Sequence, residues 1–290
     1  MRTVLLLASA ICLLVFPTRL LANAWMLDAG QWSAELYNKY YWATEDYDQN
    51  GDRVEKPNGG RYEEFRPEFK LEYGLCDQLN LLLSVPYKWA KWDDINGTIR
   101  NNGLEFVGVG AKFRLSEDDE RNPAASLQVK LEVPGGYDRD EPPSLGHGKP
   151  DLETRLMVGK VLDMPSPDAS LKLYHIGGEI GYRTLNNKIP YFLEVGVQPA
   201  KQVLLKGMID GVFGTSHIDR PPTNRELIEK KYGEYAKASG EVLFSFSPEG
   251  TFGILKNVQG LSIGLGYGYT FYGKNTAVGS EVTLKLFYRF

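Results

Sequence analysis

Two serine–histidine pairs are the residues that could support nucleophilic catalysis: Ser144 with His147, and Ser216 with His217. A histidine close to a serine can accept the hydroxyl proton and so activate the oxygen for attack on an ester. Neither pair comes with a recognisable orienting group or oxyanion hole, and His175, the third histidine, has no second histidine at metal-ligand spacing. We therefore expect no catalytic residues, no metal site and no cofactor, and keep a lipid-acting hydrolase as an alternative function.

A second candidate is the acidic segment Asp46–Gly51, which matches the opening D-x-D-x-N-G of a calcium-binding loop. The twelfth position of such a loop is normally a glutamate that completes the site with two oxygens. Here that position is Pro57, and no flanking helices are expected. A solvated acidic loop is the expectation, and binding of divalent cations by residues 43–60 stays open.

Charged side chains alternate with apolar or aromatic ones in several parts of the sequence. In Glu64–Tyr73 every even-numbered residue is charged and every odd-numbered residue is nonpolar or aromatic, and Ser126–Val133 repeats the polar and apolar alternation. Such charges could select ions, as rings of charged side chains do in pores, or could form a salt-bridge ladder that stiffens a wall. The predicted selectivity set comprises Glu64, Arg66, Glu68, Lys70, Lys112, Arg114, Lys130 and Glu132.

The elements that must position these charges are β-strands, because a period of two residues places alternate side chains on opposite faces. Most of the alternating segments contain 9–13 residues, close to the length of a tilted membrane strand. An even number of strands suits a closed antiparallel barrel that leaves no exposed edge. Residues 202–213 could also be helical. The twelve predicted strands are 31–42, 61–73, 79–89, 104–115, 126–134, 151–160, 171–183, 190–198, 202–213, 234–246, 261–272 and 280–290.

Alternation alone allows two opposite barrels: a secreted soluble one with an apolar interior, or a membrane barrel with lipid outside and a polar lumen. Mixed charges on one face of successive strands favour the membrane barrel, as does the chain ending at Phe290 on the apolar face. Aromatic residues near segment ends are typical of an interfacial girdle. The predicted girdle comprises Tyr40, Tyr41, Trp42, Tyr62, Tyr87, Trp89, Trp92, Tyr182, Tyr191, Tyr269 and Tyr272. The expected fold is thus an all-β, antiparallel, closed transmembrane barrel with a polar lumen.

Composition and the first residues define the expected compartment. The chain has 290 residues and a formal net charge of −4, which gives no basic footprint for nucleic acid. Arg2, the apolar run 4–16 and the small residues around Ala24 form the pattern of a secretory signal peptide. We predict a signal peptide at 1–24 and a single barrel domain at 25–290. Inward glycines, at positions 264, 266 and 268, are expected to relieve crowding in the wall.

Short motifs in the first half of the chain carry a resemblance to a known family. Residues 72–81, Glu-Tyr-Gly-Leu-Cys-Asp-Gln-Leu-Asn-Leu, are followed by Ser-Val-Pro-Tyr at 84–87, and Leu-Glu-Val-Pro-Gly-Gly lies at 131–136. This pattern resembles the family of the MetA pathway of phenol degradation. The resemblance implies an outer-membrane β-barrel that moves small aromatic or hydrophobic compounds, and it supplies no catalytic residues.

The predicted function is passive passage of small solutes through a channel in the outer membrane of a Gram-negative bacterium. Twelve strands lie between the 8 of side-chain-filled barrels and the 16–18 of open porins, so a narrow or partly plugged pore is expected. The expected partners are outer-membrane lipid and lipopolysaccharide, small solutes, and the barrel-assembly machinery acting on the strand that ends at Phe290. A structural or adhesive barrel with a closed lumen is the second alternative, beside the hydrolase.

Overall fold

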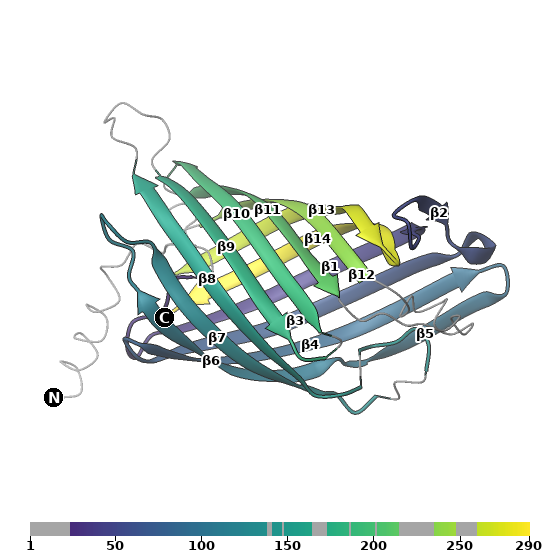
Figure 1. The fold of residues 1–290 in the computed structure, drawn as a ribbon, viewed down its shortest axis with the longest axis horizontal. Coiled ribbons are helices and arrows are strands. Elements are labelled where there is room, and N and C mark those ends of the chain that lie inside the picture. Colours follow the sequence, from purple (N-terminus) through teal and green to yellow (C-terminus); the bar gives the residue numbers. More distant parts are fainter. Residues whose placement is uncertain are drawn as a thin grey trace, which may run out of the picture.

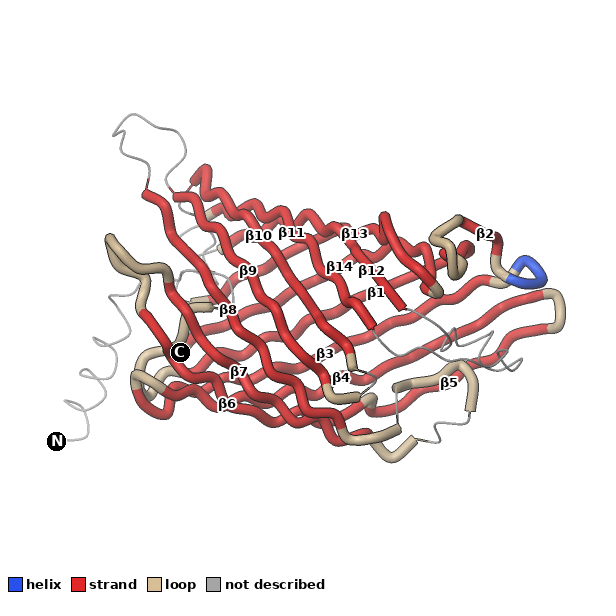
Figure 2. Tube along the Cα trace, in the orientation of Figure 1, coloured by secondary structure: helices blue, strands red, loops and turns tan. Residues whose placement is uncertain are grey.

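A computed structural model describes residues 24–137, 141–146, 148–163, 173–185, 187–200, 202–214, 235–247 and 260–290. Nearly all of the predicted signal peptide lies outside these residues, as do His147, Ser216 and His217. The regular secondary structure of the described residues is β-strand, apart from one three-residue helix (Figure 2). No helix in these ranges is long and apolar enough to cross a membrane.

The strands follow one another around a barrel, each antiparallel to its neighbour (Figure 1). β14 also pairs with β1, which closes the ring. The elements are β1 (Trp32–Tyr47), β2 (Arg53–Glu55), η1 (Pro57–Gly59), β3 (Arg61–Cys76), β4 (Leu79–Asp94), β5 (Gly97–Leu104), β6 (Phe106–Ser116), β7 (Ala124–Pro134), β8 (Asp151–Asp163), β9 (Leu173–Arg183), β10 (Lys188–Ala200), β11 (Val203–Gly214), β12 (Tyr235–Phe246), β13 (Leu261–Lys274) and β14 (Thr276–Arg289).

Twelve strands form the ring in the described part of the chain, because β5 and β6 continue one another along β4, and β2 is a short strand beside the end of β1. This confirms the predicted closed antiparallel barrel. A helix was the alternative for residues 202–213, but residues 203–213 lie in β11, which pairs with β10 on one side and β12 on the other. We call the end of the barrel where β1 starts and β14 finishes the terminal end, and the opposite end the loop end.

One predicted connection is wrong. Residues 90–103 lie between the predicted strands 79–89 and 104–115 and would therefore be a loop, but β4 continues to Asp94 and pairs with β5 from Gly97 onward. The physical reason is a two-residue hairpin turn at 95–96, followed by Gly97 with φ of 127°. A positive φ is readily available to glycine. The paired backbone therefore extends beyond the predicted strand ends at the loop end.

The charged face points into the barrel and the apolar face points out. Glu68 is 7% exposed whereas its neighbour Phe69 is 43% exposed, and Glu132 is 6% exposed whereas Leu131 is 41% exposed. A soluble barrel would show the opposite arrangement, with charged side chains in water and apolar ones inside. The barrel therefore has the inverted pattern predicted from the sequence, in which an apolar outer surface surrounds a polar interior.

Three residues of the predicted aromatic girdle face inward instead. Tyr62 and Trp92 line the interior cavity, and the Tyr41 hydroxyl donates to the carbonyl of Ala277 at 3.4 Å. These three residues share a face with inward charges on their own strands, because side chains two or four residues apart on a strand point to the same side. Tyr40 and Trp89 do lie exposed on the outer surface.

The inward glycines of β13 face bulky polar side chains of the neighbouring strands. A Cβ added at Gly266 would lie 2.4 Å from Glu241 Oε1 and 2.4 Å from Thr283 Oγ1, and one at Gly268 would lie 2.8 Å from Glu281 Cγ. Thr283 is fully buried. These contacts support the packing role expected for the glycines.

Gly266→Val should destabilise the folded barrel by about 1–3 kcal/mol, because overpacking forces the fixed Thr283 side chain and its strand to move. Gly207→Ala is the matched control, since a Cβ there meets nothing within 4 Å. Urea titration followed by heat-modifiable migration on gels measures the difference. Equal midpoints for the two variants would contradict the packing role.

Candidate functional site

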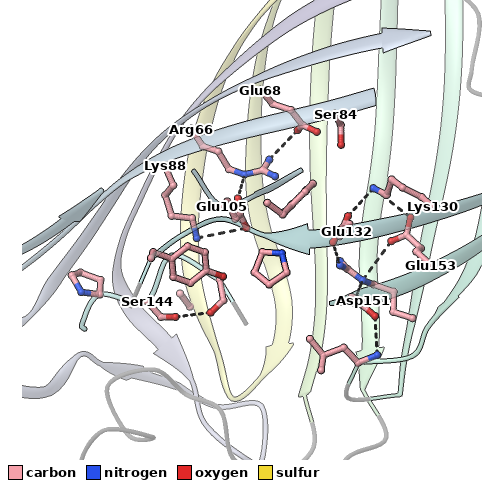
Figure 3. Close-up of a pocket in the computed structure, with 18 of the residues that line it drawn as sticks. Arg66, Glu68, Ser84, Lys88, Glu105, Lys130, Glu132, Ser144, Asp151 and Glu153 are labelled. Carbon is pink, nitrogen blue, oxygen red and sulfur yellow. Dashed lines mark hydrogen bonds and ion pairs between the residues drawn. The ribbon is translucent and has the colours of Figure 1, made fainter. Parts of the chain in front are cut away.

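A cavity of about 1140 Å³ occupies the barrel interior (Figure 3). It extends from η1 at the loop end to Lys112, which pairs with the start of β4 near the terminal end. Its wall comes from the inward faces of β1, β3, β4 and β6–β9, and from the β7–β8 connection. The cavity therefore lies on the face whose alternating charges the sequence singled out.

Six of the eight predicted selectivity residues line this cavity: Arg66, Glu68, Lys70, Lys112, Lys130 and Glu132. Glu64 lies beside the cavity, where it accepts a hydrogen bond from the Tyr62 hydroxyl at 2.7 Å. Arg114 lies apart from the cavity, at the terminal end, and forms an ion pair with Glu117 of the β6–β7 connection. The structure thus brings six of these residues to one space, and their role in selectivity stays a prediction.

The first charged cluster joins β3, β4 and the β5–β6 junction. Arg66 Nε lies 2.6 Å from Glu105 Oε2, and Arg66 Nη1 lies 3.1 Å from Glu68 Oε2. Lys88 Nζ lies 3.9 Å from Glu105 Oε1 and 3.5 Å from Glu64 Oε2. Cations and carboxylates therefore alternate in space across neighbouring strands.

A β-bulge places Glu105 in this cluster. Tyr87 of β4 pairs with Leu104, whereas Ser84 pairs with Gly108, so the β5–β6 segment contains one residue more than its partner. A bulge re-aims side chains, and here both Glu105 and Phe106 line the cavity. Strict alternation predicts that consecutive residues face opposite ways, which is why sequence counting missed Glu105.

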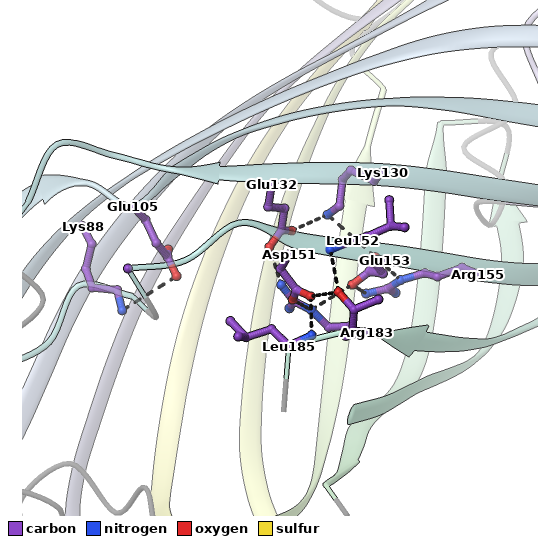
Figure 4. A network of polar contacts seen from close by, with 12 residues as sticks. Lys88, Glu105, Lys130, Glu132, Asp151, Leu152, Glu153, Arg155, Arg183 and Leu185 are labelled. Atoms are coloured by element: carbon purple, nitrogen blue, oxygen red, sulfur yellow. Dashed lines mark hydrogen bonds and ion pairs between the residues drawn. The ribbon is translucent and has the colours of Figure 1, made fainter. Parts of the chain in front are cut away.

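The second charged cluster is centred on Arg183 of β9 (Figure 4). Its guanidinium forms ion pairs with Glu132 of β7 and, at 2.6 Å, with Asp151 of β8, and lies 3.5 Å from Glu153 Oε2. Because β8 lies between β7 and β9 in the sheet, one side chain links three consecutive strands. Asp151 and Arg183 are the terminal residues of two predicted strands. At a strand end, the alternating pattern gives little reason to predict whether a side chain faces into the barrel or out of it.

Neighbouring cations complete the second cluster. Lys130 Nζ lies 2.8 Å from Glu132 Oε1, and Arg155 Nε lies 2.6 Å from Glu153 Oε1. Arg155 also reaches Glu179 of β9 at 2.9 Å. Glu153 is only 1% exposed, so its charge depends on these partners. The contacts are those of a ladder that ties the wall together, and the same charges border the cavity.

The residues considered for catalysis do not form a nucleophilic site in the described part of the chain. Ser144 Oγ donates to the carbonyl of Gly146 at 2.8 Å. His175 is buried on β9, where Nε2 lies 2.8 Å from Glu194 Oε1. Its position in the wall separates it from Ser144, which lies in the β7–β8 connection at the loop end.

The two aspartates of the calcium-like segment are engaged by the protein itself. Asp46 is buried and forms an ion pair with Lys56. Asp48 Oδ1 accepts hydrogen bonds from the backbone N–H of Asp52 at 2.9 Å and of Asn50 at 2.7 Å. These donors hold the pKa of the Asp48 carboxyl below its usual value. Among the described residues, no group of three or more His, Cys, Asp or Glu side chains could hold a metal ion.

Comparison with known proteins defines the fold but not the family. No family model and no curated protein matches the chain, so the resemblance inferred from short motifs stays a prediction. The structure is similar to an outer membrane channel from Pseudomonas putida F1, with a TM-score of 0.68 and 13% sequence identity over 93% of this chain and 99% of that one. This likeness supports the barrel fold.

Two further solved structures are more distant. The transport unit of the autotransporter AIDA-I from Escherichia coli gives a TM-score of 0.49 and 10% identity over 97% of each chain. A Pseudomonas aeruginosa FadL homologue gives a TM-score of 0.41 and 10% identity over 96% of this chain and 93% of that one.

Arg183→Ala should destabilise the barrel by about 3–5 kcal/mol, because it leaves buried carboxylates of β7 and β8 without their shared cation. Arg61→Ala is the control, since Arg61 pairs with Glu63 on the exposed loop-end surface and such pairs contribute little. The urea midpoint of each variant measures the effect. If Arg183→Ala unfolds at the midpoint of Arg61→Ala, the ladder does not stabilise the wall.

Proposed function

We propose that this protein is an outer-membrane channel through which small solutes pass passively. The observation that carries the proposal is the inverted barrel, in which an apolar outer surface encloses a cavity of about 1140 Å³ lined by paired charges. An apolar exterior is stable against lipid, and a charged interior can hold water. The fold shared with the P. putida channel supports this proposal.

The proposed location is the outer membrane. We propose that residues 1–24 direct export and are removed. We also propose that the barrel-assembly machinery recognises the strand that ends at Phe290. Phe290 stacks on Tyr288 with ring centroids 5.4 Å apart, and both rings are exposed on the outer surface. Outer-membrane lipid and lipopolysaccharide would contact this surface.

The cavity charges are proposed to set the ion preference. Cations and carboxylates are interleaved along the wall, as in the pairs of Arg66 with Glu105 and Lys130 with Glu132. A cavity wall whose positive and negative charges balance gives no strong preference for cations or anions. The reversal of one charge should therefore cause a measurable change in ion preference. The six lining residues of the predicted set are the candidates, whereas Arg114 pairs outside the cavity.

The proposed solutes are small aromatic or hydrophobic compounds. The resemblance in short motifs implies this class, and aromatic side chains contribute to the cavity wall. Trp92 and Phe106 line it from β4 and β6, and Tyr137 lines it from the β7–β8 connection. Aromatic faces bind aromatic and apolar solutes by stacking and edge contacts.

In planar bilayers the wild-type protein should give stable conductance steps, and Lys130→Glu should shift the reversal potential toward cation preference. The reason is that the change removes a positive charge from the cavity wall and adds a negative one. Lys91→Glu is the control, because Lys91 pairs with Asp93 at the exposed loop-end margin of β4. A folded, heat-modifiable barrel that stays silent would favour the structural or adhesive alternative.

Benzyl alcohol should block the ion current of the wild-type channel transiently, and Phe106→Ala should raise the half-blocking concentration about two- to tenfold, as expected for the loss of one aromatic contact. Phe113→Ala is the matched control, since Phe113 lies on the outer face of the same strand and is exposed. Equal block by a non-aromatic alcohol of the same size would argue against an aromatic preference.

A further inference from the structure

One serine hydroxyl in the cavity wall is buried without a hydrogen-bond partner. Ser84 lies on the inward face of β4, lines the cavity and is only 8% exposed. Its Oγ has no hydrogen-bond donor or acceptor within reach among the described residues. Such atoms are rare in native proteins, because a buried polar group without a partner lowers stability. The position of this hydroxyl in a cavity wall therefore points to a ligand.

Two other side chains converge on the same point of the wall. Ser84 pairs with Gly108 of β6, which has no side chain to fill the space between the strands. A Cβ added at this glycine would lie 2.6 Å from Ser84 Oγ, 3.3 Å from Phe106 Cε2 and 3.5 Å from Lys130 Cδ. A hydroxyl from β4, an aromatic ring from β6 and a lysine from β7 thus meet over one glycine, and all three line the cavity.

The ring and the lysine suit a ligand that is both aromatic and anionic. Lys130 Nζ lies 5.8 Å from the centroid of the Phe106 ring. A second aromatic ring can stack on Phe106 or meet it edge to face. The ammonium group and the Ser84 hydroxyl can both donate to a carboxylate attached to that ring, and such charge-assisted hydrogen bonds are strong. An aromatic carboxylate therefore matches all three groups.

Lys130 can turn toward a ligand without leaving a wall carboxylate unpaired. Its Nζ lies 2.8 Å from Glu132 Oε1 and 3.8 Å from Glu153 Oε1. Glu132 also forms an ion pair with Arg183, and Glu153 also pairs with Arg155 at 2.6 Å. Both carboxylates keep an arginine when the lysine moves, so the cost of an unpaired buried charge is avoided.

The same movement uncovers the serine hydroxyl. The Lys130 side chain runs over the inward glycines of β6: its Cβ lies 3.2 Å from a Cβ added at Gly110, and its Cδ lies 3.5 Å from one added at Gly108. A lysine has a flexible four-carbon chain that changes rotamer readily. Lys130 therefore covers Ser84 in the empty cavity and can move aside when a ligand binds.

The wall on the other side of Ser84 is also neutralised. Figure 3 shows the Ser84 hydroxyl between Lys130 and the pair of Arg66 with Glu68. Arg66 Nη1 lies 3.1 Å from Glu68 Oε2, so this carboxylate has its own cation. An anion beside Ser84 would therefore meet no unpaired carboxylate from β3.

We propose that Ser84, Phe106 and Lys130 form a binding site for aromatic carboxylates within the cavity. The ligand ring lies against Phe106, the Ser84 hydroxyl donates to the carboxylate, and Lys130 Nζ neutralises its charge. The site narrows the solute class of the proposed channel. Passage of the anion rests on that proposed function, whereas binding does not.

Fluorine NMR of 4-fluorobenzoate measures binding to the folded barrel in detergent, without ion flow. The neutral isostere 4-fluorobenzamide should bind about tenfold more weakly, because it lacks the charge that Lys130 neutralises. Lys130→Met should remove this difference. Lys149→Met is the matched control, since Lys149 lines the cavity from the β7–β8 connection and the variant removes the same charge at another place.

Ser84→Ala tests the role of the hydroxyl. The affinity for 4-fluorobenzoate should fall about tenfold, as expected for the loss of one hydrogen bond to a charged group. The urea midpoint should stay equal or rise, because the variant removes a buried hydroxyl that has no partner; a structural role would lower it. Ser126→Ala is the matched control, since Ser126 Oγ on β7 is also buried without a partner but Ser126 is not part of the cavity wall.

Recording in planar bilayers separates the binding site from the channel. Benzoate should block the wild-type current at about one tenth of the concentration that benzamide requires. Preferential binding with preferential block supports both the site and the channel. Preferential binding by a barrel that stays silent supports the site and overturns the channel. Equal binding of the two ligands, or a Ser84→Ala variant that binds like Ser126→Ala, overturns the site whether or not the barrel conducts.

Discussion

The interior charges must be neutralised by one another, and the rest of the structure depends on this constraint. The outer face is apolar, so the charged side chains of successive strands have only the barrel interior to occupy. Glu153 and Glu132 are nearly buried there, and an isolated carboxylate in such surroundings would be costly. Arg183 offsets this cost by forming ion pairs with carboxylates on two neighbouring strands. The same contacts therefore fix the strand register, hold the wall and define the polarity of the cavity.

The period of two was sufficient to predict the barrel, because one register decides which of Glu68 and Phe69 faces inward on the whole strand. It failed where the backbone departs from that period. The bulge at Glu105 turns two consecutive side chains into the cavity, and a hairpin turn at 95–96 extends strands into a predicted loop. The segment before β1 has no period of two, because the place of the Trp25 ring depends on Gly159, more than 130 residues away. The alternating pattern was therefore enough to predict the strands of the barrel wall, whereas the contacts inside the barrel depend on residues that are far apart in the sequence.

Ion selectivity and structural support were expected as alternative roles for the charged residues, but one arrangement of these side chains is compatible with both. Lys130 borders the cavity and pairs with Glu132, and Lys112 borders it and holds the backbone of Trp25. A side chain that is fixed by a partner presents its charge at a defined place, as a preorganised site requires. Arg114 shows the contrast, because its partner Glu117 holds it at the terminal end and away from the cavity. The position of a charged residue along its strand, more than its type, thus decides whether it lines the cavity.

The pairing of β1 with β14 also has a consequence for biogenesis. Trp32 and Phe290 exchange backbone hydrogen bonds at 2.8 and 2.9 Å, so the first and last strands of the barrel meet. Every other ring contact joins neighbours in sequence, and this one closes a loop of more than 250 residues. Closure must therefore wait for the final strand, and a chain that lost it would expose two unpaired edges to other chains. The closed ring therefore forms only when β1 and β14 are both present to pair with one another.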